Sequence, residues 1–203
     1  MSAQHKNRAR DLFDLTGRVA IVTGGAGLLG YHHGDILVAN LGSGSGKPGW
    51  EQDEAEWERL FNLNFFGSTR LAQACIPAMT KGGSIVFISS IAGVEALPAP
   101  LPYSAAKAAL VNYSKNLSRA VADRKIRVNS IAPGNIFFDG GSWEKHLAKD
   151  PDGIQAFIAK EVPLQRFGTP EEIASLAVYL CSSISGFATG ECFVMDGGQT
   201  RSF

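Results

Sequence analysis

The sequence is poor in cysteine, carries no net charge and lacks a long apolar run, and each absence excludes a class of protein. Its three cysteines form no Cys-x-x-Cys pair, which indicates reduced thiols and a cytoplasmic location rather than a disulfide framework. Nineteen basic and nineteen acidic side chains cancel, so no bulk charge favours nucleic acid as a partner. Ser, Gly and Pro interrupt the most apolar stretch, residues 85–101, so we expect no membrane span.

Two further features are missing. The four histidines have no ligand spacing with carboxylates or cysteines, so we expect no metal site. Residues 1–10 are polar and basic, without the apolar region of a signal peptide.

What is present is an ordinary globular composition. The chain has 203 residues, 45% hydrophobic and 19% charged, which predicts one domain over residues 1–203. Its 23 glycines exceed the usual share and hint at close approach of the backbone to a ligand.

Five short apolar runs predict β-strands. They are residues 18–23, 35–39, 84–89, 126–132 and 191–195. Because the runs are nearly continuous rather than alternating, they are typical of parallel strands buried on both faces.

Longer helical patterns lie between these runs. They predict helices over residues 53–76 and 103–122 and a third through about Ser182. The third opens with a capping box, Thr169 as N-cap and Glu172 at the third helical position, with Pro170 at the first. Strands alternating with helices predict an α/β, doubly wound parallel sheet of Rossmann type.

A glycine motif, Thr23-Gly-Gly-Ala-Gly-Leu-Leu-Gly30, follows the first predicted strand. Gly24, Gly27 and Gly30 would let the backbone approach a pyrophosphate at a helix N-terminus. The alternative is a turn that merely packs a helix on a strand. No acidic residue follows about 20 positions later, where a ribose-binding carboxylate is expected.

A second motif, Tyr103-Ser-Ala-Ala-Lys107, places a phenol and an ammonium on one face of a helix. Alone it is weak, because Tyr103 can be a core-edge residue and Lys107 a solvated charge. Ser90 at the end of the third strand and Asn64 on the preceding helix strengthen the interpretation as a catalytic site.

From about Leu15 to Gly198 the sequence resembles the single-domain branch of the short-chain dehydrogenase/reductase family. The matching motifs, in family order, are Ala39-Asn-Leu-Gly42, Asn64, Ser90 within Ile88-Ser-Ser-Ile-Ala-Gly93, Tyr103-x-x-x-Lys107, Ala132-Pro-Gly-Asn-Ile136, Pro163-Leu-Gln-Arg-Phe-Gly-Thr-Pro-Glu-Glu172 and Asp196-Gly-Gly198.

The resemblance implies reversible hydride transfer between NAD or NADP and a small-molecule carbonyl or alcohol. Tyr103 would be the acid and base, Lys107 would bind the nicotinamide ribose, Ser90 would position the substrate oxygen, and Asn64 would anchor a water. An ammonium about 4 Å from the phenol would lower its pKa by up to about three units.

The resemblance also implies a cofactor site around the catalytic residues. The glycines of the first motif, Tyr103 and Lys107 would take part in it. The backbone of Ile136 would hold the carboxamide. Its other members would be Asn40, Gly42, Pro133 and Gly134.

The sequence departs from the family in three places. The glycine spacing is that of the sugar-nucleotide branch, Phe138 stands where a Thr is usual, and only residues 31–39 separate Gly30 from Asn40. The runs 18–23 and 35–39 should be parallel neighbours, and a crossover between such strands needs at least about 10–12 residues. We therefore expect that roughly 50 residues, normally found between Leu28 and Gly34, are missing, and that the choice between NAD and NADP lies there.

Residues 137–161 should form a substrate lid. Its aromatic side chains could line an apolar pocket or pack the lid onto the body, and two acidic side chains could bind hydroxyls: Phe137, Phe138 and Trp143, and Asp139 and Glu144. The resemblance implies a homotetramer. Two other functions stay open, a sugar-nucleotide epimerase or dehydratase and a non-catalytic NAD(P)-binding regulator.

Overall fold

The computed structural model describes residues 13–23 and 35–201. Within them lies a five-stranded sheet in the order β1-β2-β3-β4-β5, in which every neighbouring pair is parallel. The strands are β1 (Ala20–Val22), β2 (Ile36–Ala39), β3 (Gly83–Ile88), β4 (Ile126–Pro133) and β5 (Cys192–Met195). Each corresponds to one predicted apolar run, and the predicted α/β parallel sheet is confirmed.

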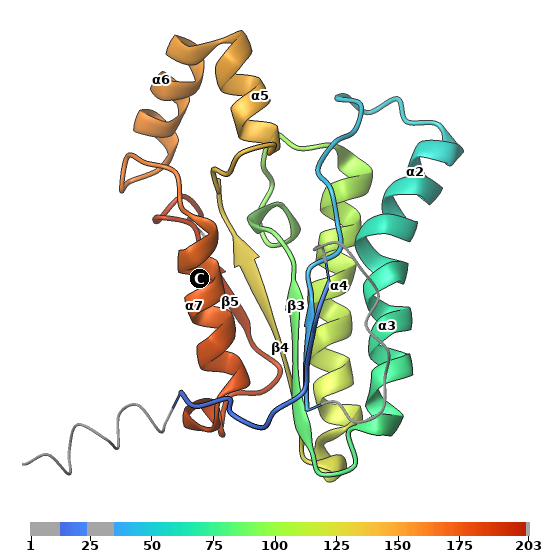
Figure 1. The fold of residues 1–203 in the computed structure, drawn as a ribbon. Coiled ribbons are helices and arrows are strands. Elements are labelled where there is room, and N and C mark those ends of the chain that lie inside the picture. Colours follow the sequence, from blue (N-terminus) through green and yellow to red (C-terminus); the bar gives the residue numbers. More distant parts are fainter. Residues whose placement is uncertain (1–12, 24–34, 202–203) are drawn as a thin grey trace, which may run out of the picture.

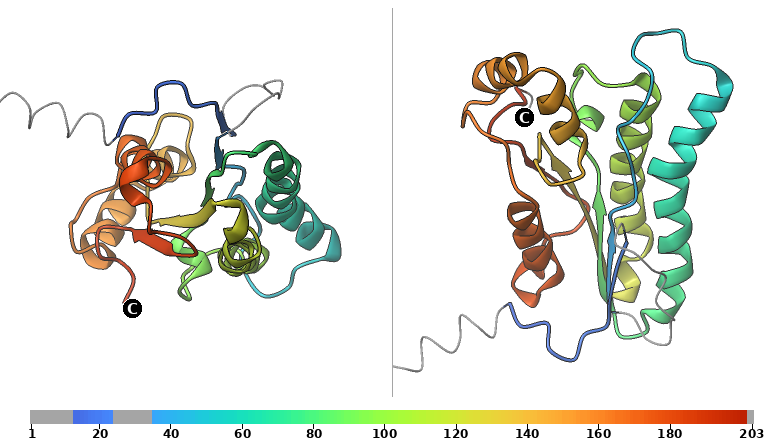
Figure 2. Two further views of the ribbon diagram at one scale, coloured as in Figure 1. Left: turned by 90° about the horizontal axis from the view of Figure 1, so that it is seen from below. Right: turned by 45° about the horizontal axis from the view of Figure 1, so that its top comes forward.

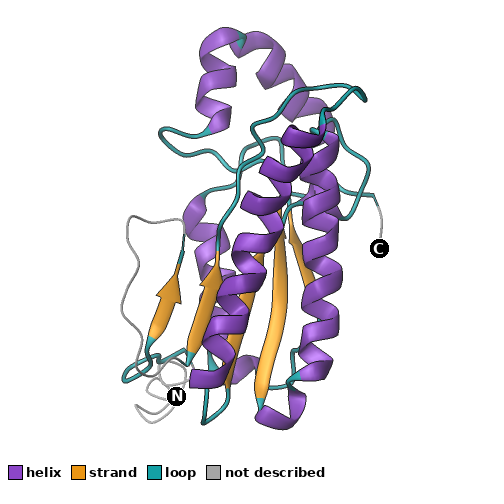
Figure 3. Ribbon diagram, turned by 90° about the vertical axis from the view of Figure 1, so that its right-hand side faces the viewer, coloured by secondary structure: helices purple, strands orange, loops and turns teal. Residues whose placement is uncertain are grey.

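Helices cover both faces of this sheet (Figures 1 and 2). One face carries α2 (Glu54–Phe61), α3 (Gly67–Cys75) and α4 (Leu101–Ala120), and the other carries α7 (Pro170–Cys181). Figure 3 shows the helices of the first face lying side by side in front of the strands. Two further helices, α5 (Ser142–Lys149) and α6 (Pro151–Glu161), stand beyond the carboxyl ends of the strands.

Alternate strand residues build a core on each face of the sheet. Leu37, Ile85 and Phe87 pack toward α3 and α4, whereas Val86 and Ile131 pack toward α7. All five are fully buried, as expected for central strands with helices on both sides.

The predicted helix over residues 53–76 is divided by a π-helical turn, Asn62–Phe66. Within it, the amide Nδ2 of Asn64 donates to the carbonyl of Leu60, 3.0 Å away, four residues earlier. A side chain that binds a helix carbonyl in this way competes with the regular backbone ladder. The turn therefore points Asn64 at the carboxyl ends of the strands.

The capping box of α7 is confirmed. Thr169 Oγ1 accepts from the backbone N–H of Glu172 at 3.4 Å, and Glu172 Oε2 accepts from the N–H of Thr169 at 2.9 Å. These reciprocal bonds fix the start of the helix that covers the second face.

Strand β1 forms one edge of the described sheet. It pairs with β2 alone, from Ala20 opposite Ile36 to Val22 opposite Val38, so the two runs are parallel neighbours as predicted. The expected missing segment, and with it Gly24, Gly27 and Gly30, falls in residues 24–34, outside the described residues. That expectation stays a prediction.

Across residues 13–23 and 35–201, no helix is both long and apolar enough to cross a membrane. The same residues contain no cluster of three His, Cys, Asp or Glu side chains that could hold a metal ion.

Candidate active site

Four predicted side chains meet at the carboxyl ends of the strands. Ser90 follows β3, Tyr103 and Lys107 lie near the start of α4, and Asn64 comes from the π-helical turn. Ser90 lies close enough to the Tyr103 hydroxyl to affect its pKa, and the Lys107 ammonium lies 5.9 Å from the centre of the Tyr103 ring. A Cβ atom added to Gly42 would contact both Asn64 and Lys107, which places these two side chains around one backbone position.

Ser90 is held by a short turn that packs directly on α4. Its Oγ accepts from the N–H of Ala92 at 3.2 Å, at the start of the 3₁₀ turn Ile91–Gly93. A Cβ on Gly93 would lie 2.6 Å from the carbonyl carbon of Lys107, so only glycine permits this approach. The sequence did not reveal Ser89, whose buried hydroxyl donates to the carbonyl of Lys107 at 3.0 Å and ties β3 to α4.

Lys107 is a buried cation. Its side chain is 4% exposed, and Nζ donates to the carbonyl of Ile88 at 2.8 Å. Burial disfavours the charged form and lowers the pKa of Lys107 to about 8.

The pKa of Tyr103 moves in the direction opposite to our expectation. Burial raises it, and the hydrogen bond from Ser90 opposes that rise. We expected the Lys107 ammonium to lower it, but the Lys107 Nζ donates its hydrogen bond to the carbonyl of Ile88. Desolvation of the phenol therefore has the larger effect.

Asn64 fixes the turn that follows β2. Its Oδ1 accepts from the N–H of Ser43 at 3.0 Å, and its Nδ2 donates to the carbonyl of Ser43 at 3.2 Å. The N–H of Asn40 donates to Thr23 Oγ1 at 3.0 Å, which joins this turn to the end of β1. The backbone around Gly42 is thus held against the catalytic side chains.

The loop after β4 holds the other predicted cofactor residues. The N–H of Gly134 donates to the carbonyl of Met195 at 3.0 Å. Farther along, the N–H of Phe137 donates to Gly168 at 3.0 Å, and the N–H of Gly168 donates to Asn135 at 2.9 Å. These three bonds fix the backbone around Ile136. None of them uses the N–H of Ile136, so that group is not occupied by them.

An apolar cavity of about 420 Å³ joins this loop to the sheet face beside α7. Its lining includes Asn40, Ile88, Pro133, Ile136 and Phe138. Most of its other lining residues come from β1, β2 and α7, so the apolar walls beside Ile136 suit the flat face of a nicotinamide ring. The glycines predicted to hold the pyrophosphate are outside the described residues.

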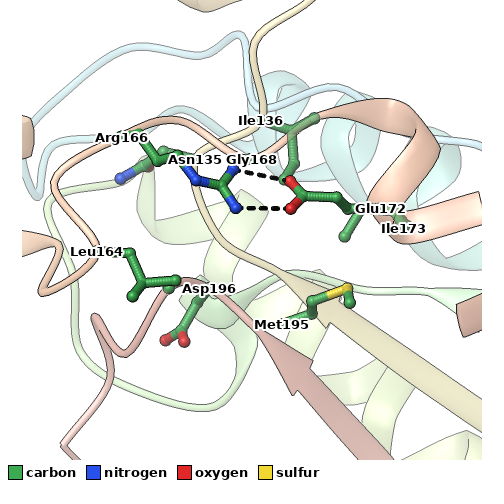
Figure 4. Close-up of a pocket in the computed structure, with 10 residues that line it drawn as sticks. Asn135, Ile136, Leu164, Arg166, Gly168, Glu172, Ile173, Met195 and Asp196 are labelled. Carbon is green, nitrogen blue, oxygen red and sulfur yellow. Dashed lines mark hydrogen bonds and ion pairs between the residues drawn. The ribbon is translucent and has the colours of Figure 1, made fainter. Parts of the chain in front are cut away.

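A smaller cavity of about 150 Å³ lies on the other side of the same loop (Figure 4). Arg166 makes two hydrogen bonds to Glu172 across it, at 2.7 and 3.0 Å. Together with the N–H of Thr169, this guanidinium lowers the pKa of Glu172 to about 2. Glu172 thereby links the start of α7 to the segment that carries Gly168.

Some aromatic side chains of the lid pack against other aromatic rings, and one lines the larger cavity. The Trp143 ring lies 5.4 Å from Phe167 and stacks on Phe157 at 5.9 Å, and Phe137 lies 5.8 Å from Phe167. The two contacts with Phe167 pack the lid onto the body, whereas the contact with Phe157 lies within the lid. Phe138, by contrast, is 50% exposed and lines the larger cavity.

Known proteins resemble this chain in sequence and structure. A family profile described as enoyl-(acyl carrier protein) reductase matches residues 30–200. The 3-oxoacyl-[acyl-carrier-protein] reductase FabG of Chlamydia muridarum is 39% identical over 167 residues, 81% of this chain and 65% of that protein. The chain therefore belongs to the short-chain dehydrogenase/reductase family.

Solved structures agree with this assignment. L-sorbose reductase from Gluconobacter frateurii, complexed with NADPH and L-sorbose, is similar with a TM-score of 0.78 at 34% identity, over 84% of this chain and 68% of that one. A 7α-hydroxysteroid dehydrogenase complexed with NADH gives 0.75 at 31% identity, over 84% and 65%.

The chain spans only about 65% of the length of curated relatives that it matches. Because 167 aligned residues are 65% of the Chlamydia protein, that protein has about 257 residues, against 203 here. The difference is close to the length of the segment that we expect to be missing.

Replacing Gly42 with Ala should disturb the site. Gly42 has a φ of +153°, and a Cβ there would lie 2.5 Å from Asn64 Oδ1 and 2.9 Å from Lys107 Nζ. We expect Gly42→Ala to lower cofactor affinity and turnover by about tenfold or more, because small displacements of positioned groups are costly. Cofactor titration and steady-state kinetics would measure both.

The matched control is Gly49→Ala. Gly49 also has a positive φ, +90°, but a Cβ there meets nothing within 4 Å. It should cost stability through backbone strain and leave cofactor affinity unchanged. Equal losses in both variants would show that strain alone, and not contact with the site, explains the effect of Gly42→Ala.

Proposed function

We propose that this chain is an NAD(P)-dependent oxidoreductase that interconverts a secondary alcohol and a ketone. The observation that carries the proposal is the proximity of Ser90 to the Tyr103 hydroxyl, with Lys107 buried beside the ring. A tyrosine, a serine and a buried cation at the carboxyl ends of parallel strands, next to an apolar cavity, suit proton transfer to a carbonyl oxygen.

The nicotinamide, when bound, supplies or accepts the hydride at the substrate carbon. In reduction, the Tyr103 hydroxyl gives its proton to the carbonyl oxygen, so that C=O becomes CH–OH. The raised pKa of Tyr103 keeps the phenol protonated for this step. Ser90 donates a hydrogen bond to the same oxygen, and bulk water restores the proton along a path that begins at Lys107 and Asn64.

The remaining residues of the site bind and orient. Lys107 would bind the nicotinamide ribose, and the backbone of Ile136 would hold the carboxamide. Asn40, Gly42, Pro133 and Gly134 would shape the walls, and Gly24, Gly27 and Gly30 would bind the pyrophosphate. Relatives complexed with NADPH and with NADH support a nicotinamide cofactor of either kind.

Residues 137–161, which contain α5 and α6, would form the substrate lid within a single domain. They stand above the carboxyl ends of the strands, where the substrate must enter. We also propose a cytoplasmic location, because the three cysteines form no disulfide, as suits a reducing compartment.

The match to reductases over residues 30–200 favours catalysis over the regulator and over the epimerase or dehydratase. A panel of ketones and alcohols, assayed with both cofactors at the nicotinamide absorbance band, distinguishes the three. An oxidoreductase changes that absorbance stoichiometrically with substrate. A regulator binds the cofactor without turnover, and an epimerase converts substrate without net change in the cofactor.

We also propose a homotetramer. Large apolar side chains are exposed in two places, with Trp57 and Phe66 beside α4 and Phe187 and Val194 near β5. Two such patches suit assembly about two axes. Sedimentation at micromolar concentration should give about four times the 21.6 kDa chain mass. A mass near 22 kDa across that range would contradict the proposal.

A further inference from the structure

The segment after β5 crosses the loop that should hold the nicotinamide. Gln199 in this segment is 9% exposed, and its Oε1 accepts a hydrogen bond from Asn135 Nδ2 at 2.7 Å. Asn135 immediately precedes Ile136. This bond is therefore a side-chain connection between the segment after β5 and the residue next to the expected carboxamide contact.

The position of Gln199 is fixed from both sides. Upstream, Asp196 accepts from the N–H of Gly198 at 2.9 Å and from the N–H of Thr200 at 2.6 Å, which closes a turn around Gln199. Downstream, the N–H of Arg201 donates to Glu95 at 2.7 Å. These bonds hold the backbone on both sides of Gln199, and so fix the position from which its side chain reaches Asn135.

The same loop segment has backbone bonds on either side of the Asn135 side chain. Gly134 bonds to Met195, and a Cβ on Gly134 would lie 2.7 Å from Asp196, so the two backbones are in close contact. Gly168 binds the loop from the opposite side through Asn135 and Phe137. Beyond Phe137 the chain continues into the proposed lid, which contains α5 and α6.

We propose that Gln199 is a positioning residue, which acts through Asn135 to keep the backbone of Ile136 in the place where the carboxamide binds. Neither side chain touches the reacting atoms. The inference rests on the proposed function, because the position of the Ile136 backbone affects binding only if a nicotinamide carboxamide binds there. Lower affinity for the cofactor, rather than loss of the chemical step, is the expected consequence of breaking the bond.

The test compares three variants. Gln199→Leu removes the acceptor at similar size, Gln199→Glu keeps an acceptor oxygen at the same place, and Asn135→Leu removes the donor. Asn116→Leu is the matched control, because Asn116 Nδ2 donates to Asn112 Oδ1 at 3.0 Å on the exposed side of α4.

The first measurement is amide hydrogen exchange of residues 133–138 without cofactor, referred to exchange in β3. We expect about tenfold faster exchange in Gln199→Leu and Asn135→Leu, because loss of one buried hydrogen bond has an effect of about that size. Exchange in Gln199→Glu and Asn116→Leu should stay at the wild-type rate. Unchanged exchange in Gln199→Leu would overturn the inference.

The second measurement is a titration with NADH and NADPH followed by protein fluorescence. Gln199→Leu should weaken binding by about five- to tenfold and Gln199→Glu should restore it, while Asn135→Leu should add little to Gln199→Leu. Faster exchange with unchanged affinity would show that the bond holds the loop without positioning the cofactor, which overturns the inference. If the wild-type chain binds neither cofactor, the proposed function fails, whereas exchange still decides whether Gln199 holds the loop.

Discussion

Tyr103→Phe should lower turnover by about 10²- to 10⁴-fold and leave cofactor affinity within a few-fold. The change removes one hydroxyl, the proposed proton donor, and general acid catalysis by a positioned side chain is worth about that much. Steady-state kinetics with the best substrate of the carbonyl panel, together with a cofactor titration, would measure both effects.

Tyr113→Phe is the matched control. Tyr113 also lies on α4, but its ring packs edge-on against Phe65 and Phe87, with centroids 5.9 and 5.8 Å away. Removing its hydroxyl should leave turnover near the wild-type value. Turnover in Tyr103→Phe that matches this control would remove Tyr103 from the mechanism.

The free energy of unfolding should rise with pH between about 8 and 10, by about 2–3 kcal/mol, because of Lys107. Its pKa is about 8 in the folded chain against 10.5 for an ordinary lysine, so in this range the unfolded chain binds a proton that the folded chain has released. Stability then increases with pH by up to about 1.4 kcal/mol per pH unit. Urea unfolding at a series of pH values would measure the rise.

Lys107→Met should abolish this rise, and Lys115→Met should keep it. Lys115 lies on the same helix, but its side chain is 56% exposed in an ion pair with Glu191. The Met variant at position 107 should also bind the cofactor more weakly, since it loses the proposed ribose contact. A pH dependence that is the same in wild type and Lys107→Met would show that burial of this amine does not limit stability.

Local rules were sufficient for most of the fold. Runs such as residues 84–89 are too apolar and too short for anything but buried strands, and the capping box at Thr169 needs only residues within one helical turn. The parallel pairing of β1 with β2 also followed from the sequence, because the runs come one after the other in an alternating pattern.

Other features depend on contacts that a local pattern does not contain. The lid was expected, but its helices α5 and α6 were not, although Asp150 followed by Pro151 is a recognisable helix start. The π-helical turn depends on where the Asn64 amide binds, and its partner Ser43 is 21 residues away.

In the active site, too, local sequence patterns did not predict the contacts between distant residues. Helical spacing correctly placed Tyr103 and Lys107 on one face, but spacing does not say where an ammonium points. The Lys107 ammonium donates to the carbonyl of Ile88, and burial is the main cause of the pKa shifts of both Lys107 and Tyr103. The hydrogen bond between Asn135 and Gln199 spans 64 positions, so no local pattern could have revealed it.

Transfer of deuterium tests the central claim most directly. The wild-type chain would be incubated with NADH or NADPH carrying deuterium at nicotinamide C4 and with a carbonyl panel that includes a 3-oxoacyl thioester, a ketose and an oxo-steroid. We predict an alcohol that is one mass unit heavier, with the deuterium on the carbinol carbon, formed about 10²- to 10⁴-fold more slowly by Tyr103→Phe. Cofactor binding without any deuterated alcohol from the whole panel would contradict the account.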